Sequence, residues 1–258
     1  FFHGGSSGHD LSRSTWLRKK ALFDKTDIHF VAVSRWLAEK CRHSSLLAGK
    51  PISVIPCAYP VESYHTEPYV TMHSYDIDYS RDIIVMGAAR LDDPVKGLPY
   101  AIKAFNYVFD TNPSWANRCL VVFFGNIRNP RQLNEMQLPF VHIGQVNDPK
   151  ILRELYARAK VVVSSSLYET LGATLIEGQA AGAVPVSFGE GGQTDIIEHG
   201  VNGYIAEYRN PESLGRYIIK ALEQPFDRAF LHNEVTRHFG AETIAARYID
   251  LFRSLLDR

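Results

Sequence analysis

Two glutamates, Glu169 and Glu177, stand eight positions apart in the stretch VVVSSSLYETLGATLIEGQAAGAVPVSF, with Gly172 between them. The stretch has the pattern of a buried strand, a polar turn, a helix that carries Glu177 about two turns along, and a second buried strand. Such a pair could act as acid and base on one bond, or could recognise hydroxyl groups. Acid–base pairs stand only about 5 to 9 Å apart across a substrate. The spacing therefore favours recognition.

The turn between the two glutamates is expected to hold an anion. Thr170, Leu171 and Gly172 precede the predicted helix, and a helix N-terminus offers unpaired N–H groups and a positive dipole end. Glu177 lies too far along the helix to contact a phosphate there, but a carboxylate can accept hydrogen bonds from two vicinal hydroxyls of a ribose. Glu169 would then lie beyond the phosphates, where a sugar would be. The order of groups predicts a sugar, a diphosphate and a ribose.

Two cations complete the predicted anion site. Arg90 and Lys96 follow another predicted strand, and fixed cations can neutralise the charge of a departing diphosphate as a metal ion does. We therefore expect no metal. The segment Asp76–Asp78 has the Asp-x-Asp spacing of metal-dependent sugar-nucleotide sites, but it precedes a strand instead of following one, so a metal site there is the weaker alternative.

Composition places the chain among globular proteins. Its 258 residues are 45% hydrophobic, and its 28 basic residues balance 28 acidic ones. A neutral chain gives no general reason to bind nucleic acid. Three widely spaced cysteines favour free thiols and a cytoplasmic location. The basic cluster Arg18–Lys20, on a helix predicted over residues 14–23, is interpreted first as a solvated face and second as a peripheral contact with the inner face of a membrane.

The first part of the chain predicts one strand–helix–strand unit. An apolar strand over residues 28–33 is followed by Ser34, which can cap a helix over residues 35–47, and by a strand over residues 51–56. Such units imply a parallel sheet. Residues 57–79 lack any period and are interpreted as a linker.

The second part alternates strands and helices from residue 81 onward. Its first strand is expected at residues 83–86, followed by a small-residue turn that presents Arg90. Further strands are predicted at residues 119–124, 140–144, 161–166, 184–188 and 203–206, and helices at residues 98–109, 149–159, 172–183 and 212–223, with two more helices broken near Gly240. The pattern predicts an α/β fold with a doubly wound, Rossmann-like parallel sheet, plus a partial second α/β domain.

Four motifs whose order along the chain matches that of a known family resemble it. The chain is similar to the retaining GT-B glycosyltransferases of family four, the group 1 transferases. The similar segments are SSSLYET-x-G-x-x-x-x-E, AAGAVPVS, GEGGQTDIIEHGVNGYIAE and GAARLDDPVKGLPYAIKAF, together with FVAVSRWLAEKCR…ISVIPCAYPVESY. The resemblance covers residues 28 to about 222. It implies that residues 1–62 are the end of an acceptor-side domain, 63–80 a linker, 81–240 the donor domain of a GT-B fold, and 241–258 a helix that packs back on the first part.

The resemblance also implies roles for individual residues. Arg90 and Lys96 would hold the diphosphate of a nucleotide-sugar donor, Glu177 its ribose and Glu169 the transferred sugar, without a protein nucleophile. The residues expected around the base and the sugar pocket are Gly144, Val146, Gly191 and Gly192. The acceptor would be a glycan or a lipid-linked glycan in surface polysaccharide or glycolipid synthesis.

Three departures from the family pattern affect these expectations. Cys57-Ala58 replaces the usual Asn-Gly of the linker, and Thr194-Asp195 replaces Pro-Glu after the Gly-Gly turn. Most of the first GT-B domain has no counterpart here, and its active-site histidine is not assigned to His3 or His9. If the 258 residues were the whole molecule, we would expect donor binding without efficient transfer. The alternative function is accordingly a noncatalytic nucleotide-sugar-binding module.

Overall fold

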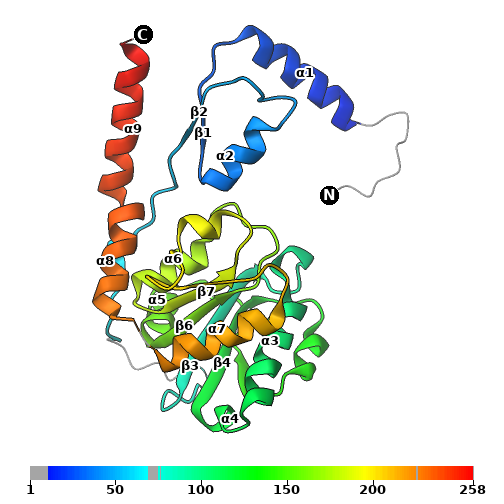
Figure 1. Ribbon diagram of the computed structural model, residues 1–258, viewed down its shortest axis with the longest axis vertical. Coiled ribbons are helices and arrows are strands. Elements are labelled where there is room, and N and C mark those ends of the chain that lie inside the picture. The colour runs from blue at the N-terminus through cyan, green and yellow to red at the C-terminus, as the bar shows by residue number, and fades with distance from the viewer. Residues whose placement is uncertain (1–10, 69–74, 76, 225, 258) are drawn as a thin grey trace.

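The computed structural model describes residues 11–68, 75, 77–224 and 226–257. Within these residues a six-stranded parallel sheet has helices on both faces, and a separate two-stranded unit lies beyond one end of it (Figure 1). The strands are β1 Phe30–Ala32, β2 Ile52–Val54, β3 Asp82–Arg90, β4 Cys119–Asn126, β5 Phe140–His142, β6 Ala159–Ser164, β7 Val184–Phe188 and β8 Tyr204–Ala206. The α-helices are α1 Leu11–Lys25, α2 Arg35–Arg42, α3 Leu98–Thr111, α4 Trp115–Arg118, α5 Pro149–Arg158, α6 Ala173–Ala180, α7 Pro211–Glu223, α8 Arg228–Phe239 and α9 Ala241–Leu256.

The large sheet has the strand order β5-β4-β3-β6-β7-β8, and every pair in it is parallel. Along the chain, β3, β4 and β5 extend the sheet from its centre to one side, and β6, β7 and β8 extend it to the other side. This is the doubly wound order of dinucleotide-binding folds, and it confirms the predicted fold class. The order reverses between β3 and β6, so the loops after these two strands meet at the same edge of the sheet.

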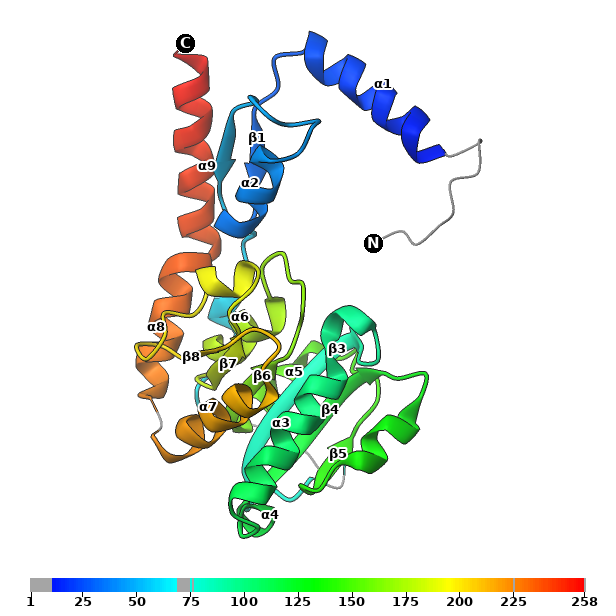
Figure 2. The same cartoon turned by 45° about the vertical axis from the view of Figure 1, so that its right-hand side comes forward.

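Two apolar layers cover the sheet. On one face α3 and α7 pack over inward residues of the strands, with Phe105 and Phe123 at a ring-centroid distance of 5.9 Å. On the other face α5, α6 and α8 pack over the alternate residues of the same strands (Figure 2). Strands buried on both faces are rich in Val, Ile and Phe, as parallel central strands require. The loops at the strand ends are thus held on a rigid base.

The two-stranded unit is formed by β1 and β2, which are parallel and joined by α2. The side chain of Ser34 accepts a hydrogen bond from the N–H of Leu37 and caps α2, as predicted. The helix ends at Arg42, earlier than the sequence indicated, because residues 43–49 turn. α9 lies alongside this unit, where Arg247 donates to the carbonyl of Val54 at 2.7 Å.

Two further expectations differ from the structure. β3 extends through Arg90, whereas a turn was predicted after residue 86; the ladder with β4 continues past an irregularity between Gly87 and Arg90. Arg90 therefore ends a strand. Glu177 is the fifth residue of α6, little more than one turn from its start, because the helix begins only at Ala173.

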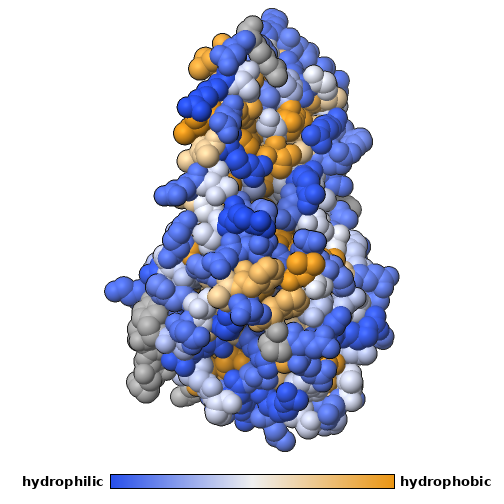
Figure 3. All heavy atoms as spheres, turned by 60° about the vertical axis from the view of Figure 1, so that its left-hand side comes forward, coloured by the Kyte–Doolittle hydropathy of each residue, from blue (hydrophilic) through white to orange (hydrophobic). Residues whose placement is uncertain are grey.

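The surface differs between the two ends of the molecule. Figure 3 shows apolar side chains gathered over the end that holds the two-stranded unit and α9. The large exposed apolar residues include Leu11, Leu17 and Leu22 of α1, and Ile249, Phe252 and Leu256 of α9. No helix among the described residues has the length and apolar character needed to cross a membrane. All three cysteines are free, as predicted.

Candidate active site

The loops after β3 and β6 are locked together at the point where the strand order reverses. The N–H of Leu167 donates to the carbonyl of Val95 at 2.8 Å, and the Ser165 hydroxyl donates to the carbonyl of Lys96 at 2.9 Å. Gly97 has a φ of 65°, and a Cβ there would meet the carbonyl of Ser165. Only glycine allows this approach. Ligands of such sheets bind in the crevice at this reversal.

This locking brings Lys96 and Glu169 into direct contact. Lys96 Nζ lies 2.8 Å from Glu169 Oε2, although the two residues are far apart in the sequence, and their side chains are 32% and 20% exposed. Both therefore remain accessible to a ligand. The sequence placed both residues in one site, but it did not predict that they pair with each other.

The loop after β7 packs against the backbone of Glu169 and Thr170, just before α6. The N–H of Gly192 donates to the carbonyl of Glu169 at 2.8 Å. A Cβ on Gly192 would meet the carbonyl of Thr170, and a Cβ on Gly191 would lie 2.7 Å from the Glu169 carbonyl oxygen. The Gly191-Gly192 pair thus lets two loop backbones touch. It borders Glu169, where the sequence placed it.

The N-terminus of α6 opens toward the same crevice. Gly172 caps the helix, and the first helical bonds run from Leu175 and Ile176 to its carbonyl, so the N–H groups of Ala173 and Thr174 have no partner within the helix. Thr170 is exposed, whereas the side chain of Leu171 is buried, so Leu171 can offer only its backbone to a ligand. The helix start that the sequence indicated is present, and anion binding at it stays a prediction.

Arg90 is held differently from Lys96. Its Nη2 donates to Asp93 Oδ2 at 2.8 Å, and its Nε lies 3.7 Å from Asp92 Oδ1. Asp92 in turn accepts hydrogen bonds from the N–H groups of Arg128 and Asn129, which help to keep its pKa below the usual range. Arg90 thus lies at the same sheet edge, with its charge directed to two neighbouring carboxylates.

Glu177 lies in an aromatic, largely buried environment. The Tyr156 hydroxyl donates to Glu177 Oε2 at 3.3 Å, and Tyr64 also hydrogen-bonds this carboxylate. Burial raises the pKa of Glu177 to about 7, and the two tyrosine hydrogen bonds oppose that rise. Sequence reasoning missed both tyrosines, because neither lies in a motif and they come from α5 and from the segment after the single-turn helix Val61–Ser63.

This buried carboxylate predicts a pH-dependent stability. The folded state holds the Glu177 proton to about pH 7 and the unfolded chain only to about 4.5, so the free energy of unfolding falls as pH rises between these values. We expect Glu177→Gln to raise the free energy of unfolding at pH 8 by about 3 kcal/mol and to leave it unchanged at pH 4. Urea denaturation at both pH values measures this. Glu223→Gln, on an exposed position of α7, is the control and should change neither value. Equal effects of Glu177→Gln at both pH values would contradict the assignment.

Gly144 and Val146 lie after β5, two strands from β3 on the same edge of the sheet. The carbonyl of Gly144 accepts from the N–H of Gly125 at 2.7 Å, which fixes this loop against β4. Val146 packs on the same face as Tyr64 and Tyr156. Val146 therefore lies on the face of the sheet that α6, the helix of Glu177, covers.

The N-terminal unit reaches the loop after β7 through two contacts that the sequence did not indicate. Trp36 Nε1 donates to Glu190 Oε1 at 2.9 Å, and the Trp36 ring meets that of Tyr168 at 6.4 Å. The backbone N–H of Arg35 donates to Asp195 Oδ2 at 2.7 Å, and its Nε donates to Oδ1 at 3.0 Å. Asp195, which stands where the family pattern has Glu, therefore joins α2 to the segment after β7.

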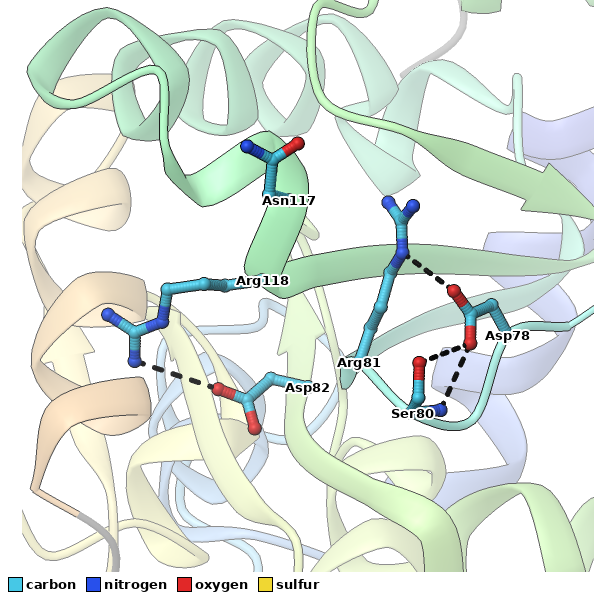
Figure 4. A pocket seen from close by; sticks show the side chains of 6 residues that line it. All are labelled: Asp78, Ser80, Arg81, Asp82, Asn117 and Arg118. Carbon is cyan, nitrogen blue, oxygen red and sulfur yellow. Dashed lines mark hydrogen bonds and ion pairs between the residues drawn. The ribbon is translucent and has the colours of Figure 1, made fainter.

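A cavity of about 530 Å³ lies at the opposite edge of the sheet, around the starts of β3 and β4 (Figure 4). Its charged groups are engaged: Arg81 Nε lies 2.9 Å from Asp78 Oδ2, and Asp82 Oδ2 lies 3.1 Å from Lys160 Nζ. Asp76, the other half of the Asp-x-Asp segment, is outside the described residues. Among those residues no cluster of three or more His, Cys, Asp or Glu side chains could hold a metal ion.

The sequence profile of the family described as "Glycosyl transferases group 1" matches residues 78–238, more than half of the chain. The chain belongs to this family. Similar curated proteins include an uncharacterized glycosyltransferase of Methanocaldococcus jannaschii, 27% identical over 63% of this chain and 43% of the relative. Spore coat protein SA of Bacillus subtilis is 27% identical over 66% of this chain and 48% of its own length. This group 1 chain thus spans less than half of these curated relatives.

Solved structures agree on the fold. A sucrose-phosphate synthase of Thermosynechococcus elongatus superimposes with a TM-score of 0.73 at 19% identity, over 98% of this chain and 64% of that one. HepE of Anabaena, solved in complex with UDP and glucose, superimposes with a TM-score of 0.70 at 17% identity, over 98% and 70%. At these identities the likeness establishes that the group 1 chain has the fold of glycosyltransferase structures.

Proposed function

We propose that the protein transfers a hexose from a nucleoside-diphosphate sugar to an acceptor, with retention of the anomeric configuration and without a metal ion. The observation that carries this proposal is the Lys96–Glu169 contact of 2.8 Å at the reversal of strand order, directly before the N-terminus of α6. A cation, a carboxylate and a helix N-terminus at one point suit a diphosphate linked to a sugar.

The residues take the following roles in this proposal. Lys96, Arg90 and the amides before α6 hold the diphosphate and stabilise its charge as it leaves. Glu169 orients the sugar, with Gly191 and Gly192 beside it, while Glu177 accepts the ribose hydroxyls and the loop from Gly144 to Val146 meets the base.

In the proposed reaction the bond from the anomeric carbon to the diphosphate oxygen breaks, and a bond to the acceptor oxygen forms on the same face. The acceptor proton passes to the departing diphosphate. We further propose a cytoplasmic enzyme of surface polysaccharide or glycolipid synthesis. Peripheral membrane contact would follow if its glycan acceptor is lipid-linked.

Calorimetric titration tests the donor half of this proposal. UDP is the first nucleotide to use, because the Anabaena structure contains it, and UDP-glucose, GDP-mannose and ADP-glucose complete the panel. We expect one of the nucleotide sugars to bind, and we expect its own nucleoside diphosphate to bind as well, because the cations recognise the diphosphate that both compounds contain. If none of these compounds binds, the proposed function is wrong.

The catalytic half is tested by donor hydrolysis, measured as free sugar released from the nucleotide sugar that binds. Glu169→Gln should reduce hydrolysis by about 100-fold or more, because an oriented charge at the sugar is lost, while binding of the free nucleoside diphosphate changes by less than threefold. Unchanged hydrolysis in Glu169→Gln would refute the role of Glu169. Binding without any hydrolysis or transfer by the unmodified protein would favour the noncatalytic alternative.

A further inference from the structure

Two tyrosines hydrogen-bond the carboxylate of Glu177, and a third packs in the same apolar cluster. Tyr156 is fully buried on α5 and donates to Glu177 Oε2, and Tyr64 is 7% exposed with its ring centroid 6.3 Å from that of Tyr156. Tyr59 lies nearby on the same linker and senses the charges of Glu177 and Glu169. Tyr156 of α5 and Tyr64 of the linker therefore hold the Glu177 carboxylate. Glu177 itself is on α6, whose N-terminus lies at the candidate active site.

The tyrosines act as hydrogen-bond donors throughout the physiological pH range. Burial and the nearby carboxylate raise the pKa of Tyr64 and Tyr156, and that of Tyr59 to about 12, so all three keep their protons. An ionised carboxylate can accept about four hydrogen bonds. Two phenols use two of these positions, and two remain for a pair of vicinal hydroxyls. A protonated carboxyl loses acceptor capacity and gains a donor, so it fits the pair poorly.

The pKa of Glu177 is set by burial and by the two tyrosine hydroxyls, and no charged side chain in the described part of the chain contributes to its shift. Arg153 of α5 faces Tyr64, and from α8 Arg228 and His232 bond the carbonyls of Ala181 and Ala180 at the far end of α6. The strands beneath α6 contribute apolar side chains such as Val162. Burial raises the pKa of Glu177 to about 7 and the two tyrosine hydrogen bonds lower it.

We propose that Tyr156 and Tyr64 are positioning residues that fix the Glu177 carboxylate for the ribose diol, so that loss of the Glu177 proton switches on donor binding. This inference rests on the proposed function, because it concerns the ribose half of the same donor site. It adds the two tyrosines and a regulation by pH to that site.

Titration calorimetry with UDP-glucose between pH 5.5 and 9 tests the switch, because the doubly esterified diphosphate of this probe keeps its charge over that range. Affinity of the unmodified protein should rise about tenfold per pH unit below pH 7 and level off above it. Tyr156→Phe removes a hydrogen bond that favours the ionised form, so the midpoint should move to higher pH while affinity at pH 9 stays within threefold. Tyr64→Phe should act in the same direction.

Glu177→Gln is the control, and its binding should be weak and independent of pH. A pH dependence that survives in Glu177→Gln would assign the switch to another group, such as His232, and overturn the inference. A uniform loss of affinity in both Tyr→Phe variants, with no movement of the midpoint, would show a merely structural role and also overturn it. If none of UDP, UDP-glucose, GDP-mannose and ADP-glucose binds at any pH, the proposed function itself fails, whereas binding that is independent of pH removes only the switch.

Discussion

Lys96→Ala is expected to weaken binding of a nucleoside diphosphate by about 10- to 150-fold. A hydrogen bond between charged groups contributes about 1.5 to 3 kcal/mol, and tenfold in affinity corresponds to about 1.4 kcal/mol. Lys96 Nζ already lies at the start of the proposed diphosphate site, 2.8 Å from Glu169. Titration calorimetry with the nucleotide that binds the unmodified protein measures the change.

Lys103→Ala is the matched control for this experiment, because Lys103 is an exposed lysine on α3, the helix that follows the Lys96 loop. It should leave affinity within twofold of the unmodified protein. The salt dependence gives a second measure, since the loss of one fixed cation should make binding less sensitive to ionic strength. Equal affinities of Lys96→Ala and Lys103→Ala would exclude Lys96 from the diphosphate site.

Arg228→Ala is expected to lower the free energy of unfolding by about 3 to 5 kcal/mol. The Arg228 guanidinium donates to four carbonyls, those of Thr66, Ala157, Ala159 and Ala181, at distances between 2.6 and 2.9 Å. The three alanines are buried, so their carbonyls would lose a charged partner without gaining full access to water. Urea denaturation at pH 7 measures the loss.

Arg237→Ala provides the comparison on the same helix. Arg237 is 67% exposed and pairs only with Glu234 in the described structure. Exposed ion pairs contribute about 0 to 1 kcal/mol, so this variant should stay within that range. Arg228→Lys keeps the charge but cannot reach four carbonyls, and it should fall between the two. A loss below about 1 kcal/mol in Arg228→Ala would mean that these hydrogen bonds contribute little to stability.

Much of the fold could be predicted because local patterns decided it. The alternation of apolar strands and helices predicted the doubly wound sheet, and Ser34 indicated the start of α2. The extent of β3 could not be predicted in the same way. Its last residues are small and polar, and only pairing with β4 keeps them in a strand.

Several residues of the candidate site could be predicted from the sequence, but the contacts between them could not. Glu169, Lys96, Gly191 and Gly192 lie together because parallel strands end at one edge, which the pattern implies. The direct bond between Lys96 and Glu169 depends on backbone bonds between two loops, which no local pattern encodes. The tyrosines at Glu177 belong to α5 and to the linker. The sequence patterns there indicate that these residues pack in the protein, but they do not indicate hydrogen bonds to Glu177.

The path of the chain between its two parts has a consequence for motion. The chain passes between the N-terminal unit and the large sheet twice, and the two passages are joined where the N–H of Tyr59 donates to the carbonyl of Phe239 at 2.9 Å. This bond ties the two passages to each other. The bond from Arg247 to Val54 makes α9 travel with β1 and β2. A rotation of the N-terminal unit against the large sheet would break the Trp36–Glu190 hydrogen bond of 2.9 Å, so a change in the fluorescence of Trp36 would report such a rotation.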